Sequence, residues 1–332
     1  MEQHTGHAAG GQPTRTPATE DAYRRRGEAL LRAWAAEGQP VSLEPAQWLA
    51  RRAPKLRAST LRQYRAALAL ILEERGEHAQ AEAVRALPQP ETRPRPAPKA
   101  TSAKKARSVP ADFEKALTRD LARGPGAKTH WGPRALMWLK ATILTGLRPS
   151  EWEHARLERN WRAGEYEGPA LLVRNAKATN GRAHGETRTL LLEQLDERDL
   201  TAVRLQALYV DPHHPDGLID ARGRPISFVR YYAAVRRTMQ LAAKRHRRGG
   251  SGSVTLYSAR HQFIANLKAA GYSLAEIAAL AGHATDDTAT EHYGRRRNGR
   301  RGGGLVRPVP DEVARIRAVM GSASLRPGKG PR

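Results

Sequence analysis

The sequence contains no cysteine, and this absence excludes disulfide bonds, thiolate zinc sites and cysteine nucleophiles. Long apolar runs are also absent, since no stretch approaches the roughly 20 residues that a membrane-spanning helix needs. Residues 1–11 carry no apolar segment behind a basic start, so we expect no secretory signal and a cytoplasmic protein without a membrane partner. A GxxxxGK loop, the pattern that cradles nucleotide phosphates, is missing as well.

Positive charge is what the sequence has in excess. Its 57 Lys and Arg residues outnumber 33 Asp and Glu residues, which gives a formal net charge of +24. A protein this basic is drawn to polyanions, and nucleic acid is the commonest polyanion in a cytoplasm. A compositional bias toward Arg with no partner is the alternative, but the excess gathers in clusters, which favours nucleic acid. A basic membrane-surface helix is a weaker alternative, because no strongly amphipathic Lys/Arg helix stands out.

The length and the local composition predict two domains with tails. Helical spacing of apolar residues marks a small first domain, and repeated prolines followed by Lys and Arg mark an extended basic linker. This linker is either a strap that lies along phosphates or a solvated hinge. The expected segments are a disordered tail at 1–20, a helical core-binding (DNA-binding) domain at 21–88, the linker at 89–108, a catalytic domain at 109–322 and a disordered tail at 323–332.

The pattern predicts a mainly α fold with a small antiparallel β-sheet (α+β). Ser59 and Thr60 are both candidate N-caps of the clearest helix in the first domain. The expected helices lie at 59–74, 112–123, 133–145, 228–244, 258–270, 273–281 and 310–320. Two short strands are expected at 170–174 and 186–192, around a polar turn.

The segment TGLRPSEW, residues 145–152, predicts a sharp corner between two helices. Gly146 suits the end of the first helix and Pro149 suits the first turn of the second. Arg148 therefore lies at the corner, where its guanidinium can point into a cleft. Glu151 follows three residues later and is expected to brace Arg148.

The segment YSARHQF places a second arginine near the start of a helix. We expect Ser258 to cap this helix, which puts Arg260 in or near its first turn. There the positive end of the helix macrodipole adds to the guanidinium in attracting an anion.

Two further segments follow in order. In SLAEIAALAGH, Ser273 and Glu276 form a capping box, and Gly282 ends the helix so that His283 lies at its exit. In EHYGRRR, Tyr293 stands beside a basic run.

This ordered set resembles the tyrosine recombinase, or phage integrase, family. The resemblance rests on Arg148 after TGL, on Arg260, on His283 in LAGH 23 residues later, and on Tyr293 after 10 more. It covers residues 109 to about 300 and extends more weakly to STLRQYRAAL in the first domain. It implies a two-domain, C-shaped clamp on double-stranded DNA, in a nucleoid-associated protein.

The resemblance also implies a mechanism that needs no metal, no cofactor and no ATP. Tyr293 attacks a DNA phosphate and remains bound as a 3′-phosphotyrosine, which stores the energy of the cleaved bond. Arg148 and Arg260 hold the non-bridging oxygens with forked, charge-assisted bonds, and His283 hydrogen-bonds the phosphate. Lys177, in the turn NAKATNGRAHGETR, is the best match for the lysine that protonates the 5′ oxygen.

One position departs from the family, which usually shows His-x-x-Arg where this chain has Tyr257. A phenol can donate to a phosphate, but its ordinary pKa near 10 makes it a poorer proton shuttle at neutral pH. His261 does not simply replace the missing imidazole, since a neighbour of Arg260 on a helix points about 100° away. Tyr257 is therefore an active-site residue or a packing residue.

The implied reaction is cleavage and religation between two DNA sites, for integration or excision of a mobile genetic element. The implied partners are other copies in a tetrameric synapse, with a C-terminal helix near 311–320 docking on a neighbour, and accessory DNA-bending or directionality proteins. The alternatives are a type IB topoisomerase or telomere-resolving enzyme, and a non-catalytic DNA-binding protein. Arg182 or Arg188 are alternatives for reaching the DNA. The candidate DNA contacts are Arg62, Lys99, Lys104, Lys105, Arg107, Arg182, Arg295 and Arg296.

Overall fold

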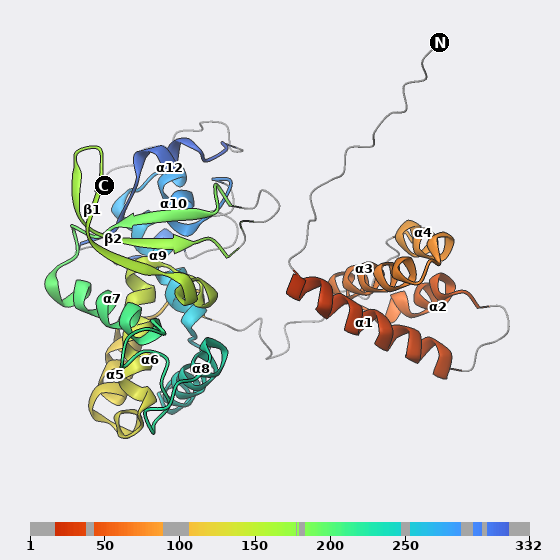
Figure 1. Cartoon of the computed structure of the whole chain (residues 1–332), viewed down its shortest axis with the longest axis horizontal. Coiled ribbons are helices and arrows are strands. Elements are labelled where there is room, and N and C mark those ends of the chain that lie inside the picture. The colour runs from red at the N-terminus through yellow and green to blue at the C-terminus, as the bar shows by residue number, and fades with distance from the viewer. Residues whose placement is uncertain are drawn as a thin grey trace, which may run out of the picture. The chain divides into compact units, whose positions relative to one another are not determined.

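The chain divides into two compact units, Met1–Ala103 and Lys104–Arg332, each with a hydrophobic core of its own (Figure 1). No helix in the described part of the chain is both long and apolar enough to cross a membrane. The computed structural model describes residues 17–37, 43–88, 106–176, 178, 183–246, 253–286, 295–300 and 304–318.

The described part of the first unit is helical, with α1 packed along α3. α1 begins four residues before the predicted domain start, because Pro17 suits a first helical position and Glu20 lies favourably in the first turn. Arg57 is the N-cap of α3, so the prediction of Ser59 or Thr60 as the cap is wrong; both hydroxyls lie inside the first turn. The helices are α1 (Pro17–Ala36), α2 (Pro45–Arg52), α3 (Ala58–Glu74) and α4 (His78–Ala86).

In the second unit, α6 packs against α5, α7, α8 and α9 and forms the centre of the core. α7 was not predicted; it is capped by Asp196, but charged residues in its first turn obscure its apolar stripe. The predicted last helix is shorter than expected and ends at Ala314. The helices are α5 (Ala111–Arg123), α6 (Trp131–Thr145), α7 (Glu197–Val210), α8 (Phe228–Arg245), α9 (Leu256–Ala270), α10 (Leu274–Ala281) and α12 (Pro310–Ala314).

A four-stranded antiparallel sheet has the order β1-β2-β3-β4. The predicted strands correspond to β2 and β3, whereas β1 was missed because its residues are charged and mostly exposed, as befits an edge strand. β4 pairs with β3 through Leu191 and Arg307. The predicted mainly helical fold with a small antiparallel sheet is confirmed. The strands are β1 (Arg156–Ala163), β2 (Tyr166–Arg174), β3 (Thr187–Leu191) and β4 (Arg307–Pro308).

Candidate active site

Arg148 lies at the corner that the sequence predicts. α6 ends at Gly146, whose left-handed backbone (φ 68°) and contact with Phe263 leave no space for a side chain. The 3-10 helix η4 (Pro149–His154) follows directly. The backbone N–H of Arg148 donates to Glu151 Oε2 at 2.7 Å, and its Nη1 donates to Oε1 at 2.5 Å. Glu151 therefore braces both the backbone and the side chain of Arg148.

Glu151 is the shared counter-ion of three arginines. Besides Arg148, it accepts a bond of 2.8 Å from Arg188 Nη2, and its Oε2 lies 4.0 Å from Arg260 Nη1. Burial by itself raises the pKa of this carboxyl, but the guanidiniums of Arg188, Arg148 and Arg260 outweigh it and hold the pKa far below its usual range. Glu151 is thus ionised and keeps three positive charges together.

Arg188 on β3 is fully buried, as Arg260 is, and its guanidinium is bonded to three protein groups. Its Nε donates to the carbonyl of Leu280 at 2.9 Å, its Nη1 to Asn175 Oδ1, and its Nη2 to Glu151. It therefore joins the sheet, η4 and the end of α10. The sequence reasoning missed this role, although an arginine inside the apolar strand TRTLLL was a signal, because a buried charge has to be paired.

Arg260 is the fifth residue of α9 and so lies next to its first turn, as expected. The prediction of Ser258 as N-cap is wrong, because Thr255 is the cap and Ser258 completes a capping box with it. Arg260 points inward, and its Nη1 and Nη2 donate to the carbonyls of Gly146 at 2.5 Å and Ala281 at 2.7 Å. These carbonyls end α6 and α10, so two negative helix termini hold the guanidinium, rather than the dipole of its own helix.

His283 follows Gly282, the left-handed C-cap of α10, as predicted. Its Nε2 lies 3.1 Å from Arg260 Nη2, and the residue is almost fully buried. Burial and the charges of Arg260, Arg148 and Arg188 lower the pKa of His283 to about 2. The imidazole is consequently neutral near pH 7 and accepts from Arg260. His184 contacts the backbone carbonyl of His283 from the sheet side, at 3.2 Å.

Tyr257 lies in the first turn of α9, and 37% of the residue is exposed. Its ring meets the edge of the buried His261 ring, with centroids 5.2 Å apart. Of the other candidates, Arg62, Arg107, Arg295 and Arg296 are exposed. The remaining site candidates, Lys99, Lys104, Lys105, Lys177, Arg182 and Tyr293, lie outside the described residues.

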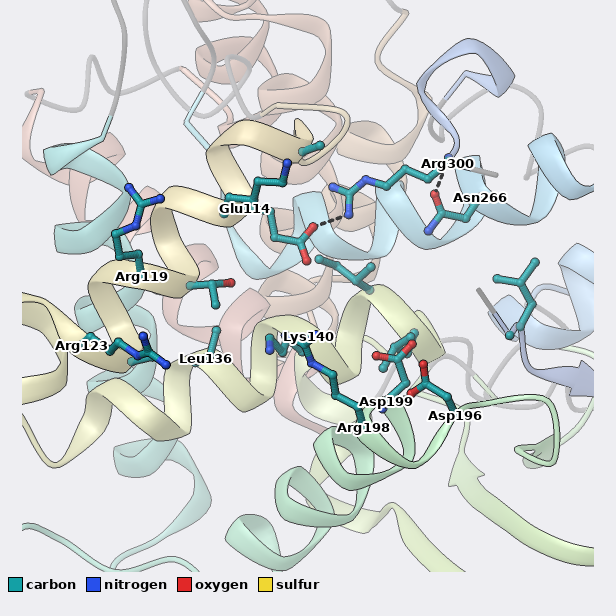
Figure 2. Close-up of a pocket in the computed structure, with 18 residues that line it drawn as sticks. Glu114, Arg119, Arg123, Leu136, Lys140, Asp196, Arg198, Asp199, Asn266 and Arg300 are labelled. Carbon is teal, nitrogen blue, oxygen red and sulfur yellow. Dashed lines mark hydrogen bonds and ion pairs between the residues drawn. The ribbon is translucent and has the colours of Figure 1, made fainter. Parts of the chain in front are cut away.

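A cavity of about 820 Å³ lies between α5, α6, α7 and the end of α9 (Figure 2). Its lining combines basic residues, acidic residues and apolar residues; they include Arg119, Arg123, Lys140, Arg198, Glu114, Asp196, Asp199 and Leu136. Arg148, Arg260 and His283 are not in its lining. Within the described ranges, no group of three His, Asp or Glu side chains is arranged to hold a metal ion.

No protein-family model and no curated protein sequence matches this chain. Solved structures do match it, and the match to a lambda integrase shows a shared fold. A lambda integrase dimer bound to a COC′ core site has a TM-score of 0.50 at 15% identity, over 87% of this chain and 92% of that one.

Two further matches have lower TM-scores. XerH recombinase bound to a palindromic difH substrate has a TM-score of 0.49 at 13% identity, over 81% of this chain and 74% of that one. The Tn1549 transposon integrase in complex with circular intermediate DNA has 0.47 at 17% identity, over 83% and 95%. The match to the lambda integrase structure, with its TM-score of 0.50, confirms the predicted resemblance to tyrosine recombinases at the level of the fold.

Proposed function

We propose that this chain is a site-specific DNA recombinase that cleaves and rejoins DNA through a 3′-phosphotyrosine at Tyr293, for integration or excision of a mobile element. The observation that carries the proposal is the convergence of Arg148, Arg260 and His283 at one site within this fold. Arg148 follows the end of α6, Arg260 lies in the second turn of α9 and His283 follows the end of α10, and together they span 135 positions of sequence. A surface arginine or a packing histidine needs no such convergence.

The chemistry follows from the residue types. The phenol of Tyr293 gives up its proton to water as its oxygen forms a bond to phosphorus, the bond between phosphorus and the 5′ oxygen breaks, and Lys177 gives that oxygen a proton. Arg148 and Arg260 stabilise the charge on the non-bridging oxygens, which grows in the transition state. His283, neutral in the free protein, donates a hydrogen bond to the phosphate. The reverse sequence rejoins the strand without ATP.

Tyr257 takes the place of the usual histidine in this proposal. Its partial exposure, one turn before Arg260, leaves its ring open to a DNA phosphate. A phenol can donate a hydrogen bond to a phosphate oxygen without changing its own charge. The alternative is a packing role, to which the edge contact with His261 contributes.

The proposed substrate is duplex DNA, enclosed by the two units in a C-shaped clamp with residues 89–108 as a strap. The lambda integrase structure is a dimer bound to a core site, and we extend this to self-association of the present chain on DNA as a tetrameric synapse. The segment after Asp311 is proposed to dock on a neighbouring copy, and accessory DNA-bending proteins to assist. The proposed contacts are Arg62, Lys99, Lys104, Lys105, Arg107, Arg182, Arg295 and Arg296.

The test is covalent capture on a suicide substrate made from the DNA that flanks the gene. The wild type is expected to form a denaturant-resistant adduct, and Tyr293→Phe none, with DNA affinity nearly unchanged because only one hydroxyl is lost. An adduct with Tyr293→Phe would refute the nucleophile assignment. If the wild type forms no adduct, the non-catalytic alternative is favoured. The presence of Tyr257 where the family usually has histidine supports that alternative. Relaxation without recombinant products would favour a type IB topoisomerase.

A further inference from the structure

Two buried side chains on α9 join segments that are far apart in sequence. Gln262 Oε1 accepts from the backbone N–H of Val109 at 3.0 Å. Its Nε2 donates to the carbonyl of Asn298 and to Asn266 Oδ1, both at 2.8 Å. Gln262 thus connects the residue that follows the 89–108 linker with the segment that follows Tyr293.

Arg300 completes the connection. Its backbone N–H donates to Asn266 Oδ1 at 3.0 Å, and its guanidinium bonds the carboxylate of Glu114 and the carbonyl of Val109. Figure 2 shows Arg300 extended between Glu114 on α5 and Asn266 on α9, at the edge of the cavity. We call Gln262, Asn266 and Arg300 the anchor.

The anchor fixes the backbone as well as the side chains. A Cβ on Gly299 would lie 2.1 Å from the carbonyl oxygen of Ala265, so the chain is pressed against α9 one residue before Arg300. The 3-10 helix η5 (Arg296–Asn298) packs on the same helix. The position of residues 296–300, which follow Tyr293 in the sequence, is therefore set by α9, the helix that also carries Arg260.

We propose that Gln262, Asn266 and Arg300 are positioning residues for the nucleophile. They hold residues 298–300 at a set distance from Arg260. Because Tyr293 lies only five residues before Asn298, they limit the positions that its phenol can take relative to the bound phosphate. The inference rests on the proposed recombinase function. In-line attack is sensitive to such placement, since an error of about 1 Å can slow a reaction about 100-fold.

A purely structural role is the alternative, and apolar packing would serve it as well. Buried amides contribute little net stability when they are fully bonded, but they specify one arrangement because a shifted partner leaves a donor or acceptor unsatisfied. A polar anchor is therefore suited to fixing the position of residues 298–300 along α9. The two roles differ in what they predict for the cleavage rate at unchanged stability and DNA affinity.

The experiment compares three single variants of the full chain with the wild type. Arg300→Gln removes the ion pair with Glu114, Arg300→Lys keeps the charge, and Arg307→Gln is the control. Arg307 also follows Tyr293 but forms an exposed ion pair with Glu193. Single-turnover adduct formation on the suicide substrate is measured with DNA affinity and melting temperature.

We expect Arg300→Gln to slow adduct formation about tenfold or more, with DNA affinity within about twofold, because binding is spread over many contacts. Arg300→Lys should recover part of the rate and Arg307→Gln should match the wild type. A wild-type rate for Arg300→Gln overturns the proposal, as does an equal loss of rate, affinity and stability. If Arg300→Gln does not fold, Glu114→Gln carries the same expectation.

Hydrogen exchange of the amides at residues 298–300, measured on the free protein, reports the anchor without any catalysis. It should become faster in Arg300→Gln and stay unchanged in Arg307→Gln. If the wild type forms no adduct, the recombinase proposal fails, whereas this measurement still shows whether the anchor holds. Unchanged exchange in Arg300→Gln would overturn the anchor itself.

Discussion

Glu151 keeps three guanidiniums within reach of one another before any phosphate is bound. Mutual repulsion would otherwise drive buried arginines apart, and burial of each charge is costly without a partner. Arg188 adds three bonds, to Glu151, to Asn175 and to the end of α10. At the scale of the residue, the site is thus a charge network in which one arginine supports the two that are proposed to hold the phosphate.

Arg188→Met should lower the free energy of unfolding by about 3 kcal/mol or more, since it leaves the buried Glu151 carboxylate short of a partner. Urea unfolding measures the loss. The double variant Arg188→Met/Glu151→Gln should lose more than Arg188→Met alone, because Glu151 also pairs with Arg148 and Arg260, but less than the sum of the two single losses, because the two residues share an ion pair. Additive effects of the two substitutions would show that the pair is not coupled. Arg162→Met, at an exposed ion pair with Glu167, is the control and should change stability little.

His283 predicts how stability depends on pH. The unfolded chain protonates this imidazole below about pH 6.5, while the folded protein does so only near pH 2. The unfolded state therefore binds more protons in this window, so stability falls as the pH drops below 6.5, by up to about 1.4 kcal/mol per unit. His130, whose pKa burial also lowers, acts in the same direction.

The measurement compares urea midpoints at pH 7.5 and pH 5 for the wild type and for His283→Gln. Glutamine keeps a neutral acceptor near Arg260 but cannot titrate. The variant should therefore lose less stability between the two pH values than the wild type does. Parallel curves would mean that His283 is not buried in its neutral form.

At the scale of the element, helix ends build the site. α6 and α10 both end at a glycine in the left-handed conformation, and Arg260 donates to a carbonyl at each end. Where the backbone turns at each glycine, the last carbonyls of the helix lack a partner within the helix, and a cationic side chain can donate hydrogen bonds to them. The glycines Gly146 and Gly282 thus direct the chain toward Arg148 and His283 and leave carbonyl acceptors for Arg260.

Gly282→Ala should reduce both stability and cleavage. Its φ of 65° strains an alanine by about 1–2 kcal/mol. The new Cβ would also lie 2.5 Å from Asn175 Oδ1 and 2.7 Å from Arg188 Nη1, which forces the arginine network to move. Gly271→Ala is the matched control, because Gly271 has a φ of 90° at the end of α9 with open space around it.

The control should lose stability comparably through backbone strain alone and keep the wild-type rate of adduct formation. Melting temperature and single-turnover cleavage separate the two effects. If Gly282→Ala also cleaves at the wild-type rate, the arginine network tolerates displacement and its geometry does not limit the reaction.

At the scale of the whole molecule, the net charge of +24 predicts DNA binding that weakens steeply with salt. Each neutralised phosphate contributes a slope of about −0.9 in a log–log plot of affinity against salt. If the linker lies on phosphates, a variant with Lys99, Lys104, Lys105 and Arg107 changed to Gln should flatten the slope by as much as about 3.6.

A control variant should remove the same number of charges elsewhere. Arg32, Arg162, Arg204 and Arg224 each form an ion pair with a neighbouring acid, so their charges are locally compensated. Changing these four to Gln should alter the slope less than the linker variant does. Equal slopes for the two variants would mean that net charge, and not the linker, sets the salt dependence.

The sequence by itself determined the local features, because these depend on neighbours within a few residues. It predicted the corner at Arg148, the capping box of Ser273 with Glu276, and the glycine that ends α10 before His283. It also predicted the mainly helical fold with its small sheet. It missed α7 and the exposed edge strand β1, because charged residues interrupt the regular spacing of their apolar residues. It also placed the N-cap of α9 at Ser258 instead of Thr255.

Only the tertiary structure decided which distant groups meet. Nothing in the local pattern of TRTLLL indicates that Arg188 contacts Glu151, 37 residues earlier, or that Arg260 bonds carbonyls at the ends of two other helices. Such pairings depend on how helices and sheet pack, because a buried charge takes whichever partner the packing brings within reach. The residue types set the available chemistry, and the packing of α6, α9, α10 and the sheet decided which of them act together.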